Sequence, residues 1–339
     1  MLMLRKNFRT KLIVMGSLIM IAGGTAAAAG SNVPEASFDL NGSHYDVVDG
    51  MLLQGPSRGV QKAVQRVYDP EFYVKNFAQD GNQLVRLGND GQKYPVKPDL
   101  NEGFENAKSI VDLIGLERGW TDFTLLGPAS RSAGEYSALR QRILRGKSTF
   151  LDNRVEPSSE RAHSGLTSLR TYSVASNGDM QLTKASLGSS LFHFKKGEHF
   201  WYSAWYFLEK GRPWSLVDLE STFLDQGGGM RLMLTDDLRP FFQLKWPSRP
   251  EYRAEAPDDT VLRSGVWTHI KVHFLLSEGA DGVAQLWIDD HLTIDAKGQT
   301  LPVAKIVYDS LEVGNTANPP KTETVLFIDD IKASHQQVN

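Results

Sequence analysis

The chain contains no cysteine. It therefore has neither a disulfide nor a cysteine for lipid attachment, and its fold must depend on a buried core. An excess of one charge is also missing, because 37 Lys and Arg oppose 40 Asp and Glu, a formal net charge of −3. This balance gives no general attraction for nucleic acid or an anionic membrane, so we expect no nucleic-acid partner. A charged ligand would have to be held by a local patch.

A membrane-spanning apolar run is absent as well. The N-terminal apolar stretch, Leu12–Ala22, is shorter than the roughly 20 residues of a spanning helix. Basic residues from Arg5 to Lys11 precede it, and small residues from Thr25 to Gly30 follow it. This order predicts a Sec-type signal peptide over residues 1–29, and hence a periplasmic or extracellular protein with no membrane insertion after cleavage. An uncleaved N-terminal anchor is the minor alternative.

The most regular stretch, Val266–Asp290, predicts a β-hairpin. Its first half alternates between an apolar face that includes Ile270 and Val272 and a polar face that includes Lys271. The loop Ser277–Gly282 is rich in Gly and Asp and would turn the chain back. Such a hairpin is typical of a two-layer sheet protein, whose apolar faces pack together between the layers.

The remainder of the chain is a succession of short strands with one clear helix, at residues 134–146. This pattern predicts an all-β fold, a two-sheet jelly-roll sandwich with a few short helices, over residues 103–335. Residues 30–102 are rich in Gly, Asp, Asn and Pro, and we interpret them as an irregular N-terminal segment or arm with short strands near 44–48 and 83–87. The expected strands of the main domain lie near 180–187, 190–194, 199–208, 217–223, 230–234, 241–246, 267–276, 283–289, 310–314 and 324–333.

Several of these strands have a polar face. Arg231 alternates with apolar neighbours, and so do Gln243 and Lys245 on the next strand and His269, Lys271 and His273 in the hairpin. If these strands adjoin in one curved sheet, they would line a groove for an acidic sugar chain, because Lys and Arg pair with carboxylate or sulfate. The alternative is that these side chains are only solvated, as on most outer sheet faces.

Aromatic rings are interleaved with these positions, and a ring at a sugar site can stack on the apolar face of the sugar. We expect one or two of them at a site and the others in the core. The rings concerned are Trp201, Trp205, Trp214, Trp246, Tyr252 and Trp287.

Two groups of carboxylates are candidates for other chemistry. Asp218 and Glu220 are two residues apart on one expected strand and would face the same side, as a pair for glycoside hydrolysis would require. Asp329 and Asp330 lie on the last strand, and Glu105 would be near them if the first and last strands pair. Glu105 and Asp330 are therefore candidate ligands of a structural calcium ion, with a solvated strand end as the alternative. The histidines show no zinc-binding spacing.

The motifs of the C-terminal half resemble the concanavalin A-like jelly rolls. Within that group, the chain is most similar to the heparin lyase I and glucuronan lyase group of polysaccharide lyases, over roughly residues 103–335. The motifs that carry the resemblance are 163–169 (HSGLTSL), 197–205 (GEHFWYSAW), 265–269 (GVWTH), 282–289 (GVAQLWID), 311–314 (LEVG) and 327–331 (FIDDI).

This resemblance implies a secreted protein that binds an acidic polysaccharide and cleaves it by β-elimination without a required cofactor. In that chemistry a cation or amide neutralises the uronate carboxylate, a base removes the C5 proton and an acid protonates the leaving oxygen. The candidate catalytic residues are His269, Lys245, Tyr252 and Arg231. The candidate substrate-binding residues are Lys184, Gln243, Lys271, His273, Glu220, Trp246 and Trp287.

The chain also departs from the family pattern. Related lyases often have an Arg-x-Glu strand where this chain has Thr183–Ser186, and a late Lys-x-Gly-x-Tyr strand where it has Glu312–Thr316. Two alternatives to a lyase therefore stay open. One is a non-catalytic carbohydrate-binding or matrix protein with the same jelly roll, and the other is a glycoside hydrolase that uses Asp218, Glu220 and Glu312. The sequence does not set the oligomeric state or the sugar.

Overall fold

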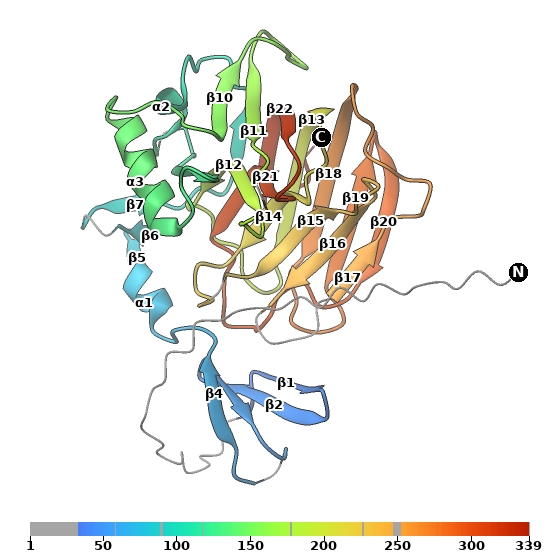
Figure 1. The fold of residues 1–339 in the computed structure, drawn as a ribbon. Helices are drawn as coiled ribbons and strands as arrows, with labels where there is room; N and C mark the ends of the chain where they lie inside the picture. The colour runs from blue at the N-terminus through green and yellow to red at the C-terminus, as the bar shows by residue number, and fades with distance from the viewer. Residues whose placement is uncertain are drawn as a thin grey trace, which may run out of the picture.

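The computed structural model describes residues 33–338, except 58, 89, 90, 117, 177, 226 and 247–251. The expected signal peptide lies outside the described residues. Two large antiparallel sheets pack face to face and form a β-sandwich, as the sequence predicts (Figure 1). In the described part of the chain, no helix has the length and apolar composition needed to cross a membrane.

The first layer is an eight-stranded sheet in the order β10-β11-β22-β13-β18-β19-β20, with β8 paired to the far end of β22. Its strands are β8 (Leu100–Glu102), β10 (Arg154–Ser158), β11 (Ser168–Ser173), β13 (His199–Lys210), β18 (Trp267–Leu275), β19 (Val283–Ile288), β20 (His291–Lys297) and β22 (Thr324–Ser334). The predicted hairpin is confirmed as β18 and β19. The pairing of β8 with β22 confirms that the first and last strands of the sandwich adjoin.

The second layer is a seven-stranded sheet in the order β17-β16-β15-β14-β21-β12-β9. Its strands are β9 (Asp122–Leu126), β12 (Thr183–Ser189), β14 (Ser215–Glu220), β15 (Gly229–Leu234), β16 (Pro240–Lys245), β17 (Tyr252–Glu255) and β21 (Ser310–Asn318). The helix α3 (Ala133–Leu144) lies beside β9, and its first turn is closed by a capping box between Ser132 and Glu135.

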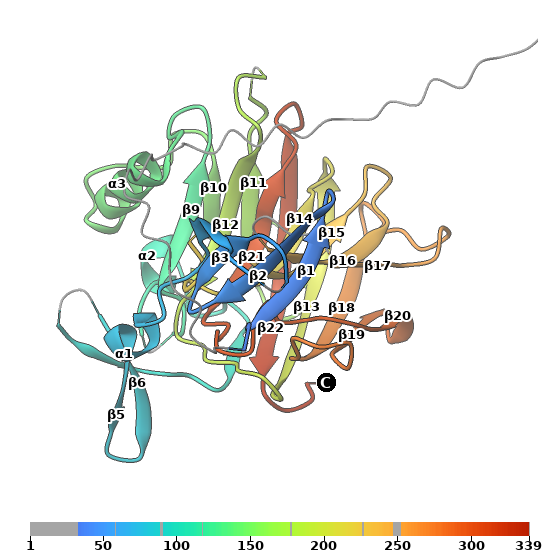
Figure 2. The same cartoon turned by 90° about the horizontal axis from the view of Figure 1, so that it is seen from below.

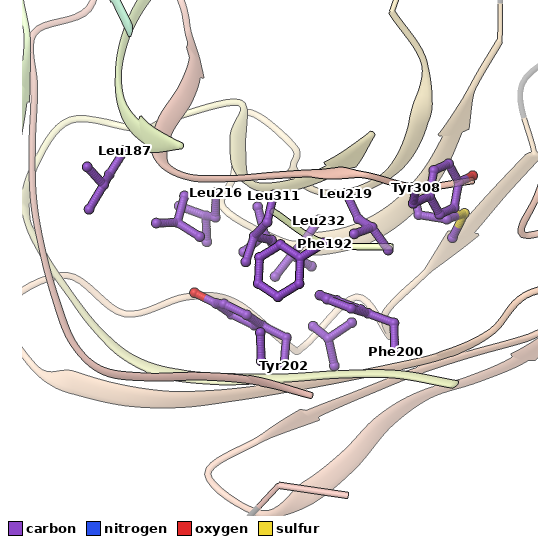
Figure 3. Packing of buried hydrophobic residues seen from close by; sticks show 14 of the residues in the cluster. Leu187, Phe192, Phe200, Tyr202, Leu216, Leu219, Leu232, Tyr308 and Leu311 are labelled. Carbon is purple, nitrogen blue, oxygen red and sulfur yellow. The ribbon is translucent and has the colours of Figure 1, made fainter. Parts of the chain in front are cut away.

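The core fills the space between the two layers. Leu219 and Leu311 from the seven-stranded sheet meet Phe200 and Tyr202 from the eight-stranded sheet, with Phe192 between them (Figure 3). In β18, Ile270, Val272 and Phe274 point into this core and are at most 3% exposed. Since side chains alternate along a strand, the residues between them point outward. The sandwich therefore has two outer faces, which look in opposite directions.

One expected strand is wrong. Residues 190–194 form no strand, although Leu191, Phe192 and Phe194 are buried. This segment crosses the end of the sandwich, where its backbone bonds to separate partners, including Lys97 and Tyr308. Its residues are apolar because the segment is buried, and this apolar pattern resembles that of a strand. The other expected strands of the main domain and the helix are confirmed within a few residues.

The N-terminal segment forms two small antiparallel sheets. The first contains β1 (Ala36–Leu40), β2 (Ser43–Val48), β3 (Met51–Gln54) and β4 (Lys62–Arg66), and the second contains β5 (Phe77–Asp80), β6 (Gln83–Leu87) and β7 (Lys93–Pro95). The strands expected near 44–48 and 83–87 are thus confirmed. Short helices α1 (Phe72–Asn76) and α2 (Ile110–Leu113) lie in the connections.

The sheet of β1–β4 covers one end of the sandwich (Figures 1 and 2). Its Phe38 packs against Trp246 at a ring separation of 6.0 Å, and Val47 and Leu52 belong to the main core. Arg66 bonds to Asp225 at 2.9 Å in the loop after β14. This small sheet therefore contributes side chains to the main core.

Arg86 of β6 attaches the second small sheet to the sandwich. Its guanidinium bonds to the carboxylate of Asp309 at 2.7 Å and to the carbonyl of Ser190 at 2.9 Å. Asp309 is fully buried, and Thr222 donates to it from both its backbone and its hydroxyl. The cation is thus the charge partner of a carboxylate that water does not reach.

We predict that Arg86→Ala lowers the free energy of unfolding by about 3–5 kcal/mol, because it leaves the buried Asp309 charge without its cation. The matched control is Arg154→Ala, whose side chain is 53% exposed and only 3.9 Å from Glu156; it should cost at most about 1 kcal/mol. Urea unfolding measures both. Equal losses of unfolding free energy in the two variants would contradict the role of Arg86 as the charge partner of Asp309.

Candidate functional site

Six charged side chains gather on the outer face of the seven-stranded sheet. We call Lys184, Asp218, Glu220, Arg231, Lys245 and Glu312 the ionic cluster. The strand register brings them together, because Glu312, Asp218, Arg231 and Gln243 face each other in one line across β21, β14, β15 and β16. The residues that alternate with them, such as Leu219 and Leu232, point into the core.

Most charges of the cluster are already paired. The Arg231 guanidinium bonds to the Glu220 carboxylate and lies 3.6 Å from that of Asp218. The Lys184 ammonium is 3.4 Å from Glu312, which also accepts a hydrogen bond from Ser186. Side-chain exposures of 14% for Arg231, 21% for Glu220 and 1% for Asp218 show that the network is largely withdrawn from water. Such buried charges are tolerated because each has a partner.

Asp218 and Glu220 have different environments although they lie on the same strand. Burial raises the pKa of Asp218, which accepts hydrogen bonds from Ser215 at 2.6 Å and Thr316 at 3.0 Å. Burial acts in the same direction on Glu220, but the Arg231 cation outweighs it and lowers the pKa of that carboxyl. Divergent pKa values are typical of an acid and base pair. Asp218 is nevertheless enclosed, so a sugar has no access to its carboxylate.

Lys245 is the exception to this pairing. Its ammonium forms no ion pair with a carboxylate among the residues that the structure describes, although Glu220 and Asp218 lie near enough to act against the lowering of its pKa. Burial, and after it the cation of Arg231, lowers the pKa of its ammonium. In the strand register, Gly229 stands between Glu220 and Lys245, so it contributes no side chain to the gap between them. A Cβ at Gly229 would lie 2.0 Å from the carbonyl oxygen of Leu219, so this position requires glycine.

The hairpin residues do not join this group. His269, Lys271, His273 and Trp287 lie on β18 and β19 of the other sheet, and they point outward on the opposite side of the sandwich. The condition that all the polar strands adjoin in one sheet is therefore not met. The reason is that β18 pairs with β13 and β19, whereas β15 and β16 pair with each other and with β14 and β17.

On that opposite side the rings form what we call the aromatic belt. It consists of Trp201, Trp205, Trp267, Trp287, His163, His199, His269 and His273. Trp205 is stacked between two imidazoles, His163 at 3.7 Å and His269 at 4.9 Å. A second stack runs from His199 through His273 and Trp201 to Trp287, at 5.0, 4.0 and 5.8 Å.

A chain of hydrogen bonds fixes His273. Gln285 donates to Asp295 at 2.9 Å, so its amide oxygen faces His273 and accepts from Nδ1 at 2.8 Å. The other nitrogen, Nε2, then accepts from Nδ1 of His199 at 2.7 Å. Burial lowers the pKa of His273, and it also lowers that of His269. Both rings are therefore held in the neutral form.

Two expected site residues face the core. Trp246 is 4% exposed and packs against Phe38. Tyr252 shares its side of β17 with the core residues opposite it on β16, and its hydroxyl donates to the carbonyl of Lys297 at 3.1 Å. The placement of both side chains away from the outer face is a correction to the sequence analysis. Alternation with Gln243 and Lys245 already places Trp246 on the core side, and Tyr252 lies on the separate strand β17, opposite Leu244.

Glu105 and Asp330 hold the same turn, as the sequence predicts from the pairing of the first and last strands. Glu105 accepts from the backbone of Leu166 and Thr167 at 3.0 Å, and Asp330 accepts from Ser164 at 2.7 Å and bonds to His163 at 2.8 Å. These donors already occupy the carboxylates, and no group of three or more His, Cys, Asp or Glu among the described residues could hold a metal ion. Calcium takes six to eight oxygen ligands, a set that these residues do not complete. A structural calcium ion here stays a prediction.

The outward positions of β9, β12, β14, β15, β16, β17 and β21 contain neither histidine nor tyrosine. The candidate base and acid of an elimination, His269 and Tyr252, are thus both absent from the face that holds Lys245 and Arg231. The sequence analysis missed Ser186, Gly229 and the stacking of His163. Alternation along Thr183–Ser189 places Ser186 beside Lys184, whereas the two other contacts depend on distant strands.

No family model and no curated protein matches the chain. Solved structures with a similar fold include an endo-β-1,4-glucuronan lyase from the fungus Trichoderma reesei, with 9% identity over 64% of this chain and 91% of that chain, at a TM-score of 0.47. The cellulose-induced protein Cip1 has 16% identity over 56% and 88%, at 0.41. The alginate lyase Aly36B has 13% identity over 70% and 97%, at 0.39. These are distant similarities of fold, and they assign no activity.

We predict that His273 makes stability depend on pH. Because its folded-state pKa is lowered, its contribution is present above the unfolded value of about 6.5 and is lost as the pH falls through the folded value. The stability advantage of the wild type over His273→Gln should therefore shrink between pH 8 and pH 5. Urea midpoints of both proteins at each pH measure it. An advantage that grows on acidification would show that protonated His273 is the stabilised form.

Proposed function

We propose that the chain binds an acidic polysaccharide on the outer face of the seven-stranded sheet. In this proposal the ammonium of Lys245 pairs with a uronate carboxylate of the polysaccharide. The observation that supports this is the state of Lys245, which is partly desolvated and forms no ion pair with a carboxylate among the described residues. The expected signal peptide supports a location in the periplasm or outside the cell, where polysaccharides are met.

The charges of the ionic cluster favour an anionic ligand at one point only. Its three cations, Lys184, Arg231 and Lys245, balance its three carboxylates, but both carboxylates near Arg231 and the one near Lys184 are already engaged. A carboxylate that arrives beside Lys245 would pair with the remaining cation and raise the pKa of its ammonium again. Charge-assisted bonds of this kind are stronger than bonds between neutral groups.

The neighbours of Lys245 suit the remainder of a sugar ring. Gly229 places no side chain between Lys245 and Glu220, and the Glu220 carboxylate can accept from a hydroxyl. Gln243, which faces Arg231 across the strand pair, adds an amide to the same row. Carboxylates and amides that are fixed by their own partners are well suited to hydroxyl recognition, since little side-chain freedom is lost on binding.

Binding without cleavage is the function that this geometry supports best. β-Elimination needs one group to neutralise the carboxylate and another to remove the C5 proton, and Lys245 cannot perform both tasks at once. Hydrolysis needs two accessible carboxylates on either side of the scissile bond. Asp218, one of the pair considered for that role, is 1% exposed and bonded on both sides.

One observation favours a second candidate, a polysaccharide lyase. The lowered pKa of Lys245 increases the fraction of neutral amine, which is the form that acts as a base. Arg231 or Lys184 would then have to leave a carboxylate of the cluster in order to neutralise the substrate.

We predict that Lys245→Met weakens binding of a uronate polysaccharide at least about tenfold, or about 1.4 kcal/mol, because it removes the only unpaired cation of the cluster. Affinity electrophoresis in gels that contain alginate, glucuronan or heparin measures this. The control is Lys195→Met, a lysine that is 61% exposed and away from the cluster. Wild-type retention in Lys245→Met, or no retention of the wild type in any gel, would contradict the proposal.

We also predict that the wild type produces no rise in absorbance near 232 nm, roughly where an unsaturated uronate absorbs, because the face lacks a second group for proton transfer. The same polysaccharides serve as substrates over a pH range. A rise that Lys245→Met abolishes would replace the binding protein with the lyase. A rise that survives this variant would place the base elsewhere.

A further inference from the structure

The aromatic belt is an unusual surface for the outside of a sheet. It contains four of the seven tryptophans and four of the eight histidines of the chain. Trp201, Trp205, Trp267 and Trp287 are all half-buried, although no other layer covers them in the described structure. Outer faces of antiparallel sheets are normally polar, so rings gathered there indicate a surface with a partner.

The rings are held rigidly before any ligand arrives. Trp205 is fixed by the imidazoles on its two faces, with His163 tied to Asp330 and His269 facing Asp290 at 3.7 Å. Trp201 is fixed by His273, which the bonds to His199 and Gln285 hold in place. A surface whose side chains are already ordered loses little conformational entropy when it binds.

The belt also presents polar groups at its edge. Within the described residues, none of the four indole N–H groups donates to a protein acceptor. Lys271 lies 5.3 Å from the centre of the Trp287 ring and 3.7 Å from Asp290, which is 78% exposed. Trp287 has only Trp201 as a ring neighbour in the described structure, and Leu292, opposite it on β20, is 49% exposed.

These features fit a sugar chain better than a protein. The core of a protein interface is depleted in charged residues, whereas the belt combines rings with N–H donors and carboxylates. Val266 and Leu292 are exposed aliphatic residues beside it. Rings bind the apolar faces of sugars, and indole, imidazole and carboxylate groups bond to hydroxyls.

The charge of the belt points to a neutral sugar. The cations on this side include Lys271, Lys332, Arg161 and Arg263, and the anions include Asp290, Asp295, Asp330, Glu209 and Asp289. The charged side chains therefore give the surface no positive excess that would hold a polyanion.

We propose that the aromatic belt is a second carbohydrate-binding site, which takes a neutral, hydroxyl-rich polysaccharide chain over Trp287 and Trp201. Its ligand does not depend on that of the ionic cluster. Because the two sites lie on opposite sides of the sandwich, one copy of the chain joins a neutral polysaccharide to an acidic one. This joining, unlike the second site itself, rests on the proposed function.

Affinity electrophoresis in gels that contain a neutral polysaccharide, namely laminarin, xylan or hydroxyethyl cellulose, tests the second site. Trp287→Ala should weaken retention about three- to tenfold, and Trp287→Phe should restore most of it, because a ring remains for stacking. Lys245→Met serves as the matched control and should leave this retention unchanged. Thermal unfolding of each variant shows that the sandwich is intact.

The same variants in an alginate gel separate the two proposals. We expect Trp287→Ala to bind alginate like the wild type, while Lys245→Met does not. Retention in a neutral gel without retention in the alginate gel would support the second site and contradict the proposed function. No retention in any neutral gel, retention that Trp287→Ala does not change, or loss of alginate binding in Trp287→Ala would overturn the second site.

Discussion

The pleat of the two sheets is the constraint on which the function of this protein depends. Alternate residues of each strand must enter the shared core, so the residues between them are forced onto one of two outer faces that look away from each other. Strand order then decides which polar residues meet. β21, β14, β15 and β16 adjoin and assemble the ionic cluster, while β13, β18 and β19 adjoin in the other layer and assemble the belt. The two surfaces therefore have separate chemistry from the start.

The charges of the ionic cluster are compatible with burial because they compensate each other. Arg231 satisfies Asp218 and Glu220 together, and Glu312 satisfies Lys184. Removing either partner of such a pair is expensive, whereas Lys245 bears its desolvation without an ion pair. A side chain in that state costs stability, and an anion bound beside it, as proposed above, would offset that cost. Lys184 and Arg231 are thus engaged by carboxylates of the cluster, and Lys245 is the cation that we propose for the ligand.

The two-residue period predicted much of this correctly. It placed Ile270 inward and Lys271 outward, and it located β13, β15, β16, β18 and β19 nearly to the residue. It could not predict which sheet each strand joins, because that depends on pairings between distant segments such as β13 with β22. For the same reason His269 was placed in the groove with Lys245. Trp246 and Tyr252 were expected at the site because they are rings among polar residues. Composition alone does not show that Trp246 packs against Phe38 or that Tyr252 lies opposite the core residue Leu244.

The N-terminal sheet gives the ionic cluster a fixed end. Trp246, which follows Lys245 in the chain, is held by Phe38, and the loop that leads from Glu220 to Gly229 is held by the bond of Arg66 to Asp225 and by the bridge between Tyr68 and Leu224. Both sides of the gap over Gly229 are therefore attached to the same small sheet. Since a binding site loses affinity when its walls move, the segment that looked least regular in the sequence contributes to the order of the site. The core extends through this sheet for the same reason, because Val47 and Leu52 bury their side chains against the end of the sandwich that carries the gap.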